Sequence, residues 1–144
     1  MAIIKEMKFY ISSSIDNLTK EGLADGEPER NDITVEGFYK ISDEGYYEIT
    51  YSEMTEGGKV VSDIIITSSS VTVKRRGAVD SEMVFSEGLL HKSLYTVSPY
   101  SFDAEVLTKR IRNGLTKDGG RIDIFYNMKI GGADKAVKMR IDCR

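Results

Sequence analysis

Two charged residues continue apolar series whose alternation is typical of β-strands, and they have the clearest potential for chemistry. Glu53 follows the series that includes Tyr51, and Arg75 follows the series that ends at Val73. If the odd-numbered apolar positions face the interior, both charged side chains point inward. Because burying an unpaired charge is costly, Arg75 needs a partner. The partner is either Glu53, in an ion pair half in water, or the carboxylate or phosphate of a ligand.

Tyrosine is the second feature that bears on a binding site. The chain has 8 tyrosines, and several lie on the apolar faces of the expected strands. Such side chains either line a cavity for an amphipathic molecule or pack an ordinary barrel core. The candidate ligand-binding residues are Tyr51, Glu53, Arg75, Tyr95 and Tyr126.

His91 is the residue that bears on proton transfer, because imidazole can act as an acid or a base near neutral pH. The serine runs at 12–14 and 68–70 lack the Gly-x-Ser-x-Gly turn that projects a nucleophile. An enzyme would require His91 and Glu53 to converge with Arg75. We predict no catalytic residue, and an enzyme is the least favoured of the functions considered.

Metal and cofactor chemistry is not expected from this composition. One histidine, His91, and one cysteine, Cys143, cannot furnish a His/Cys zinc site. The glycine pairs lie between expected strands, and no glycine-rich loop leads into a helix as a phosphate cradle requires. We therefore predict neither a metal nor a cofactor.

The candidate residues need a framework, and the alternation pattern describes one. About ten short alternating segments are separated by turn residues, including Gly57-Gly58 and Gly131-Gly132. An antiparallel sheet removes its edges by closing on itself, so we predict an all-β fold, a single antiparallel up-and-down barrel formed by residues 1–144. A barrel with more than about eight strands can enclose a cavity.

Two segments depart from the alternating pattern. Between residues 101 and 113, apolar residues recur at helical spacing, so pattern alone leaves a helix and a strand open. Residues 18–32 contain many acidic residues and no apolar periodicity. We interpret 18–32 as a long acidic loop, and a lid is one role for it.

The charge and the composition limit the classes of partner that we expect for this protein. The 144 residues carry a net charge of −3, with 30% charged and 40% hydrophobic residues, which fits one globular domain. Basic residues gather at 74–76 and 109–112, but stacking aromatics do not lie between them, so no nucleic-acid partner is predicted.

The N-terminal segment has Lys5, Glu6 and Lys8 among its apolar residues rather than the uninterrupted core of a secretory signal. The longest aliphatic run, 64–66, is far shorter than the roughly 18 residues that cross a membrane. We therefore predict a cytoplasmic protein with no membrane partner.

Several motifs together resemble a known family over nearly the whole chain. They are Gly37-Phe38-Tyr39; Tyr51 and Glu53; Arg75-Arg76-Gly77-Ala78-Val79 after Val71-Thr72-Val73; Phe85, Gly88 and Tyr95; Thr108 and Ile111; and 120–128. With these motifs the chain resembles the bacterial YwiB-like family of unknown function, whose members form a calycin-like barrel similar to lipocalins. The resemblance implies a long, bulged strand at 101–113, and it supplies no catalytic residues.

Two main hypotheses follow. In the first, the barrel lumen binds a small apolar or amphipathic ligand through the five candidate residues. In the second, the barrel is filled and serves as an interaction module. Its outer strands, including the basic stretch 109–112, then dock on another protein or on a second copy in a homodimer.

Overall fold

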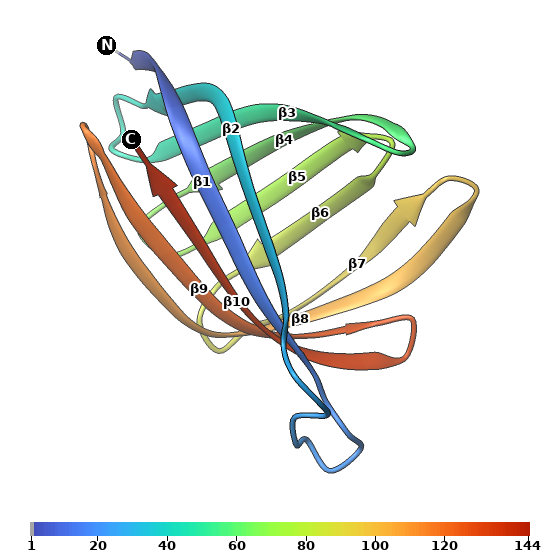
Figure 1. Ribbon diagram of the computed structural model, residues 1–144. Helices are drawn as coiled ribbons and strands as arrows, with labels where there is room; N and C mark the ends of the chain where they lie inside the picture. Colours follow the sequence, from blue (N-terminus) through green and yellow to red (C-terminus); the bar gives the residue numbers. More distant parts are fainter. Residues whose placement is uncertain (1) are drawn as a thin grey trace.

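The computed structural model describes residues 2–144, and within them ten strands and no helix form one closed barrel. Each strand pairs antiparallel with its neighbours in the chain, and β1 closes the barrel against β10 (Figure 1). The predicted all-β, up-and-down barrel is confirmed. The strands are β1 (Ile3–Asn17), β2 (Glu29–Ile41), β3 (Tyr47–Thr55), β4 (Gly58–Ile66), β5 (Val71–Gly77), β6 (Asp80–Phe85), β7 (Leu90–Val97), β8 (Tyr100–Thr116), β9 (Gly119–Ile130) and β10 (Ala133–Cys143).

The hydrophobic core lies inside the barrel, because one side of every strand faces inward. Tyr51 and Val73 are 4% and 6% exposed, so odd-numbered positions of β3 and β5 face the interior, as the alternation predicted. Across the β3–β4 turn the parity changes, and the buried residues of β4 are Val60, Ser62, Ile64 and Ile66. Glu53 and Arg75 therefore lie on inward-facing positions of their strands.

The segment 101–113 is a strand, and a bulge explains its helical spacing. The register between β8 and β9 shifts between Thr108 and Arg110. Before the bulge Val106 and Thr108 face inward, whereas Ile111 packs against the core after it. One extra residue thus turns alternating positions into spacings that mimic a helix. The Glu87 carboxylate accepts a hydrogen bond of 2.8 Å from the Ile111 amide beside the bulge.

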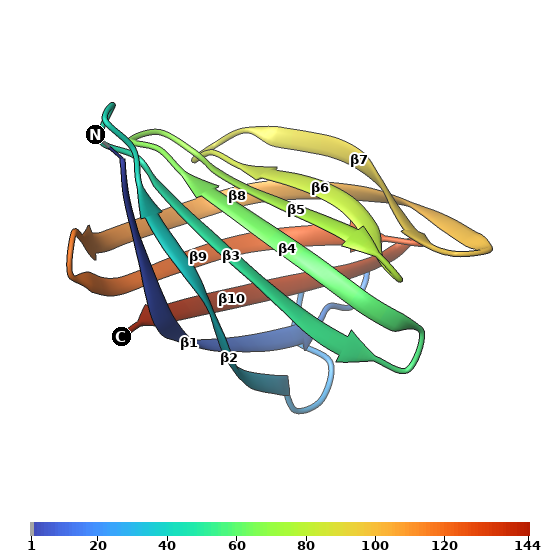
Figure 2. The same ribbon diagram turned by 90° about the horizontal axis from the view of Figure 1, so that it is seen from above.

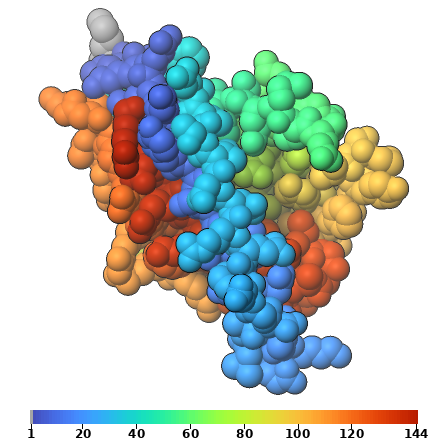
Figure 3. Space-filling model, viewed as in Figure 1, coloured from blue at the N-terminus to red at the C-terminus, as the bar shows by residue number. Residues whose placement is uncertain are grey.

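The predicted loop 18–32 is too long by four residues. β2 begins at Glu29, and Glu29 to Asp32 pair with the end of β1. Backbone pairing needs no apolar periodicity, so a polar extension of a hairpin is not visible as a strand in the sequence. The remaining connection, 18–28, contains one isolated bridge between Leu18 and Ala24. It projects away from the barrel, in blue at the bottom of Figure 3.

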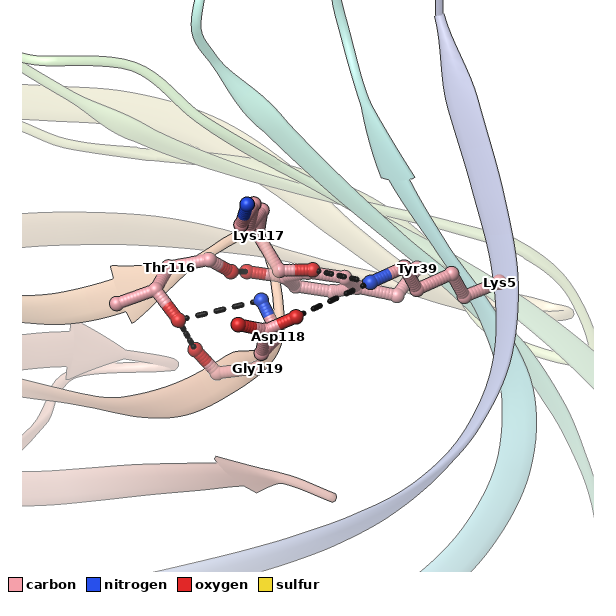
Figure 4. A network of polar contacts seen from close by, with 6 residues as sticks. All are labelled: Lys5, Tyr39, Thr116, Lys117, Asp118 and Gly119. Atoms are coloured by element: carbon pink, nitrogen blue, oxygen red, sulfur yellow. Dashed lines mark hydrogen bonds and ion pairs between the residues drawn. The ribbon is translucent and has the colours of Figure 1, made fainter.

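One end of the barrel is closed by the turn between β8 and β9, which folds toward β1 and β2 on the left of Figure 1. The Tyr39 hydroxyl donates a hydrogen bond of 2.6 Å to the Thr116 carbonyl, and the Lys5 ammonium donates one of 2.8 Å to the Lys117 carbonyl (Figure 4). The Tyr39 ring stacks on Tyr47 at 5.5 Å between centroids. The two hydrogen bonds link β1 and β2 to the β8–β9 turn, which is far from them in the sequence.

Gly119 permits the close approach at this end. Its φ of +111° is rarely adopted by residues with a side chain, and a Cβ there would collide with the Cys143 carbonyl. The opposite end carries the turns that follow β3, β5, β7 and β9, on the right of Figures 1 and 2. We call the end at the β8–β9 turn the closed end, and the opposite end, where a cavity lies inside the barrel, the open end.

Candidate functional site

A cavity of about 430 Å³ occupies the open end of the barrel lumen. Its walls combine apolar side chains with a smaller set of polar ones, as small-molecule sites do. All five candidate residues predicted from the sequence line this one cavity: Tyr51, Glu53, Arg75, Tyr95 and Tyr126.

Strand register explains how residues from five strands reach one level of the wall. Tyr51 of β3 is opposite Ser62 of β4, and Ser62 is opposite Arg75 of β5. Arg75 is opposite Ser81 of β6, which in turn is opposite Tyr95 of β7. These five residues form a continuous polar row around the lumen, which we call the polar row.

The wall becomes apolar toward the closed end. Next to the polar row, Val73 is opposite Met83, and beyond them Val71 is opposite Phe85. Phe85 is fully buried, and its ring lies 4.6 Å from that of Tyr126, between centroids. Burial raises the pKa of Tyr126 to about 12, so its phenol stays protonated at neutral pH. The floor of the cavity is therefore uncharged and largely apolar.

Arg75 is the charged member of the polar row. Its Nε is buried and has no hydrogen-bond partner among residues 2–144, and within the same residues no carboxylate lies within 4.0 Å of it. Burial raises the pKa of Tyr51, and the Arg75 charge opposes that rise. The guanidinium thus lies near a neutral phenol and lacks an anionic partner within the described chain.

The predicted alternative of an ion pair between Glu53 and Arg75 is wrong, and register gives the reason. Glu53 is opposite Val60, and Val60 is opposite Gly77. Glu53 therefore lies one inward-facing position beyond the polar row, toward the mouth of the cavity at the open end of the barrel. Both side chains line the cavity, but they occupy different levels of its wall.

Lys135 is a lining residue that we did not predict. It lies at an odd position of β10 with Val137 and Met139, and all three line the cavity. The alternation of β10 carries this signal, because Lys135 has the same parity as its buried neighbours. Ser13 and Asn31 of the β1–β2 hairpin complete the polar part of the lining.

His91 is not among the residues that line this cavity in the described chain. Its Nε2 lies 3.4 Å from the Glu82 carbonyl of β6, across a gap where β6 and β7 pair at only two positions, Ser81 to Tyr95 and Asp80 to Thr96. Glu53 and Arg75 do line the cavity. The convergence of His91 with Glu53 and Arg75 that an enzyme would require is therefore absent from the lining.

The basic residues beside Arg75 point outward. Arg76 forms an ion pair of 2.9 Å with Asp63 of β4, and Lys74 lies 4.0 Å from Glu82 of β6. The basic stretch of β8, Lys109 to Arg112, places three of its four residues, Lys109, Arg110 and Arg112, at exposed positions. Among residues 2–144, no helix is long and apolar enough to cross a membrane.

Comparison with known proteins gives a family and a fold. Residues 16–142 match the model of a domain of unknown function, DUF1934. The chain is 31% identical over 107 residues to the uncharacterized beta-barrel protein YwiB of Bacillus subtilis (strain 168), covering 74% of this chain and 75% of that protein. The crystal structure of the ywiB protein from Bacillus subtilis superposes with a TM-score of 0.80 at 24% identity, over 96% of this chain and 92% of that one. The chain therefore belongs to the DUF1934 family, and its closed barrel is the fold of YwiB.

Proposed function

We propose that this protein binds a small apolar or amphipathic molecule in the barrel lumen. Tyr51, Glu53, Arg75, Tyr95 and Tyr126 orient the molecule, and the apolar floor receives its apolar part. The observation that carries the proposal is the buried Nε of Arg75, which has no partner among residues 2–144. A charged donor held in this way, at the wall of a cavity, favours a ligand as its partner.

Native mass spectrometry of the protein purified from the lysate of its own host tests the proposal. The expected result is a reproducible small-molecule adduct that is absent from the denatured sample. The adduct is lost in Arg75→Ala and retained in Arg76→Ala, which removes the same side chain from the outer face of the same strand. An apo spectrum for the wild type, or equal adducts in both variants, contradicts the proposal.

An interaction module is the second candidate, and exposed apolar residues favour it. Ile4 and Phe38 are 62% and 50% exposed on the outer face of β1 and β2, and with Lys40, Glu48 and Thr50 they line a surface depression of about 400 Å³. The lumenal cavity favours ligand binding over a filled barrel. A mass spectrum that contains only an apo dimer would reverse this preference.

Three further expectations accompany the proposal. A cytoplasmic location rests on the N-terminal sequence and stays a prediction, which fractionation of host cells checks. The absence of nucleic-acid and membrane partners also stays a prediction, and co-purification from the same lysate checks both.

A further inference from the structure

The charged residues on the cavity wall indicate the charge of the ligand. Arg75 and Lys135 are basic and Glu53 is acidic, and within residues 2–144 none of the three takes part in an ion pair. The other lining residues are uncharged. The lining therefore carries one net positive charge, in a concave site whose apolar walls strengthen its attraction for anions.

The donors of the polar row indicate the chemical group that meets this charge. A guanidinium has five N–H donors and no acceptor, and its planar fork matches the two oxygens of a carboxylate. The Tyr51 phenol, which is influenced by the Arg75 charge, keeps its proton because burial raises its pKa. Ser81, opposite Arg75, also lines the cavity and adds a hydroxyl that can donate to an anion.

The depth of the cavity indicates the length of the apolar part of the ligand. From the level of Arg75 to the level of Phe85, which is opposite Val71, the wall rises by four residue-to-residue steps along β5, which is about 13 Å at about 3.3 Å per step. Val73, Met83 and Met139 lie along this path and line the cavity. An extended chain of about eight carbon atoms fits this length.

We infer that the ligand is an amphipathic monoanion whose carboxylate binds Arg75 and whose apolar tail extends toward Phe85; this inference rests on the proposed lumenal binding. A cationic head would have Glu53 alone as its partner, against two positive charges. A dianionic head would exceed the net charge of the lining and face Glu53 at the mouth. A single negative charge on the ligand neutralises the one net positive charge of the cavity lining.

Isothermal titration calorimetry with three probes of equal chain length, octanoate, 1-octanol and octylammonium, tests the inference. The expected result is that octanoate binds the wild type about tenfold or more tightly than 1-octanol, and that octylammonium binds most weakly. In Arg75→Met the preference for octanoate disappears, while 1-octanol binds within about twofold of its wild-type affinity. Arg76→Met, the outward-facing control, keeps the preference.

The outcomes separate this inference from the proposed function. Equal affinities of octanoate and 1-octanol for the wild type overturn the monoanion and leave lumenal binding standing. Tightest binding of octylammonium also overturns it and identifies Glu53 as the anchor. If no probe binds at millimolar concentration, both the inference and the proposed function fail.

A second variant keeps the test valid if Arg75→Met does not fold, which circular dichroism shows. Glu53→Gln removes the negative charge from the mouth while keeping the shape of the side chain. We expect it to tighten octanoate binding by about threefold relative to 1-octanol binding, since only the anion is repelled by the Glu53 charge. Weaker binding of octanoate to Glu53→Gln would overturn the inference.

Discussion

The two ends of the barrel differ in whether a buried hydrogen-bond donor has a partner within the chain. At the closed end, the hydroxyl of the buried Tyr39 donates a hydrogen bond of 2.6 Å to the Thr116 carbonyl. At the open end, the Nε of Arg75 is buried without a partner among residues 2–144. The same alternation places both residues inside. The difference indicates that contacts at the closed end stabilise the fold, whereas the open end leaves a donor for something outside the chain.

The closed end contributes the larger share of stability in this comparison, and removing Tyr39 tests that statement. Tyr39 is fully buried and packs on Tyr47. We expect Tyr39→Ala to lower the free energy of unfolding by about 3–5 kcal/mol, because it leaves a large cavity. Urea denaturation followed by circular dichroism measures this loss.

Tyr39→Phe is the matched control, since it keeps the ring and removes only the hydroxyl that reaches Thr116. We expect a loss of about 0.5–1.5 kcal/mol from the missing hydrogen bond. If Tyr39→Ala destabilised the protein by less than Tyr39→Phe is expected to, the closed end would not be a stabilising region, and the comparison would fail.

The stability of the protein at alkaline pH is a second test of the closed end, because Cys143 is buried there. Burial raises the pKa of its thiol from 9.0 to about 12. Between these values the unfolded chain loses a proton that the folded chain keeps, so stability is complete below pH 9 and falls as the pH rises. For this one group we expect a loss of about 3 kcal/mol by pH 11, at about 1.4 kcal/mol per pH unit.

The Cys143→Ala variant isolates this effect from the buried tyrosines, whose raised pKa values act in the same direction. Chemical denaturation between pH 8 and pH 11 should give a steeper fall in stability for the wild type than for the variant. Parallel curves would show that the thiol titrates alike in both states, and that the closed end does not exclude water from Cys143.

The sequence predicts one side of each strand well, because parity depends only on local alternation. It placed Tyr51 and Arg75 on inward-facing positions, and both line the cavity. It could not predict which residues meet across strands. The wrong ion pair between Glu53 and Arg75 followed from parity without register, since Arg75 is opposite Ser62 and Glu53 is opposite Val60.

Two other differences between the prediction and the structure also come from the pairing between strands. The bulge between Thr108 and Arg110 shifts the parity of β8 by one residue, so its apolar positions match a helix as well as a strand. The polar start of β2, from Glu29 to Asp32, pairs through its backbone alone. In both places the tertiary pairing of the barrel, rather than the type of side chain, decides the structure.

The smallest expected effect concerns Arg75 itself, and it distinguishes a binding residue from a structural one. Without ligand, Arg75→Met removes a half-buried charge that has no ion-pair partner in residues 2–144, so we expect stability to stay unchanged or to rise by up to about 1 kcal/mol. Arg76→Met breaks an exposed ion pair with Asp63 and should cost about 0–1 kcal/mol. Thermal denaturation of both ligand-free variants measures the difference. A loss of several kcal/mol in Arg75→Met would mean that the chain itself satisfies the guanidinium, and the contrast between the two ends would then disappear.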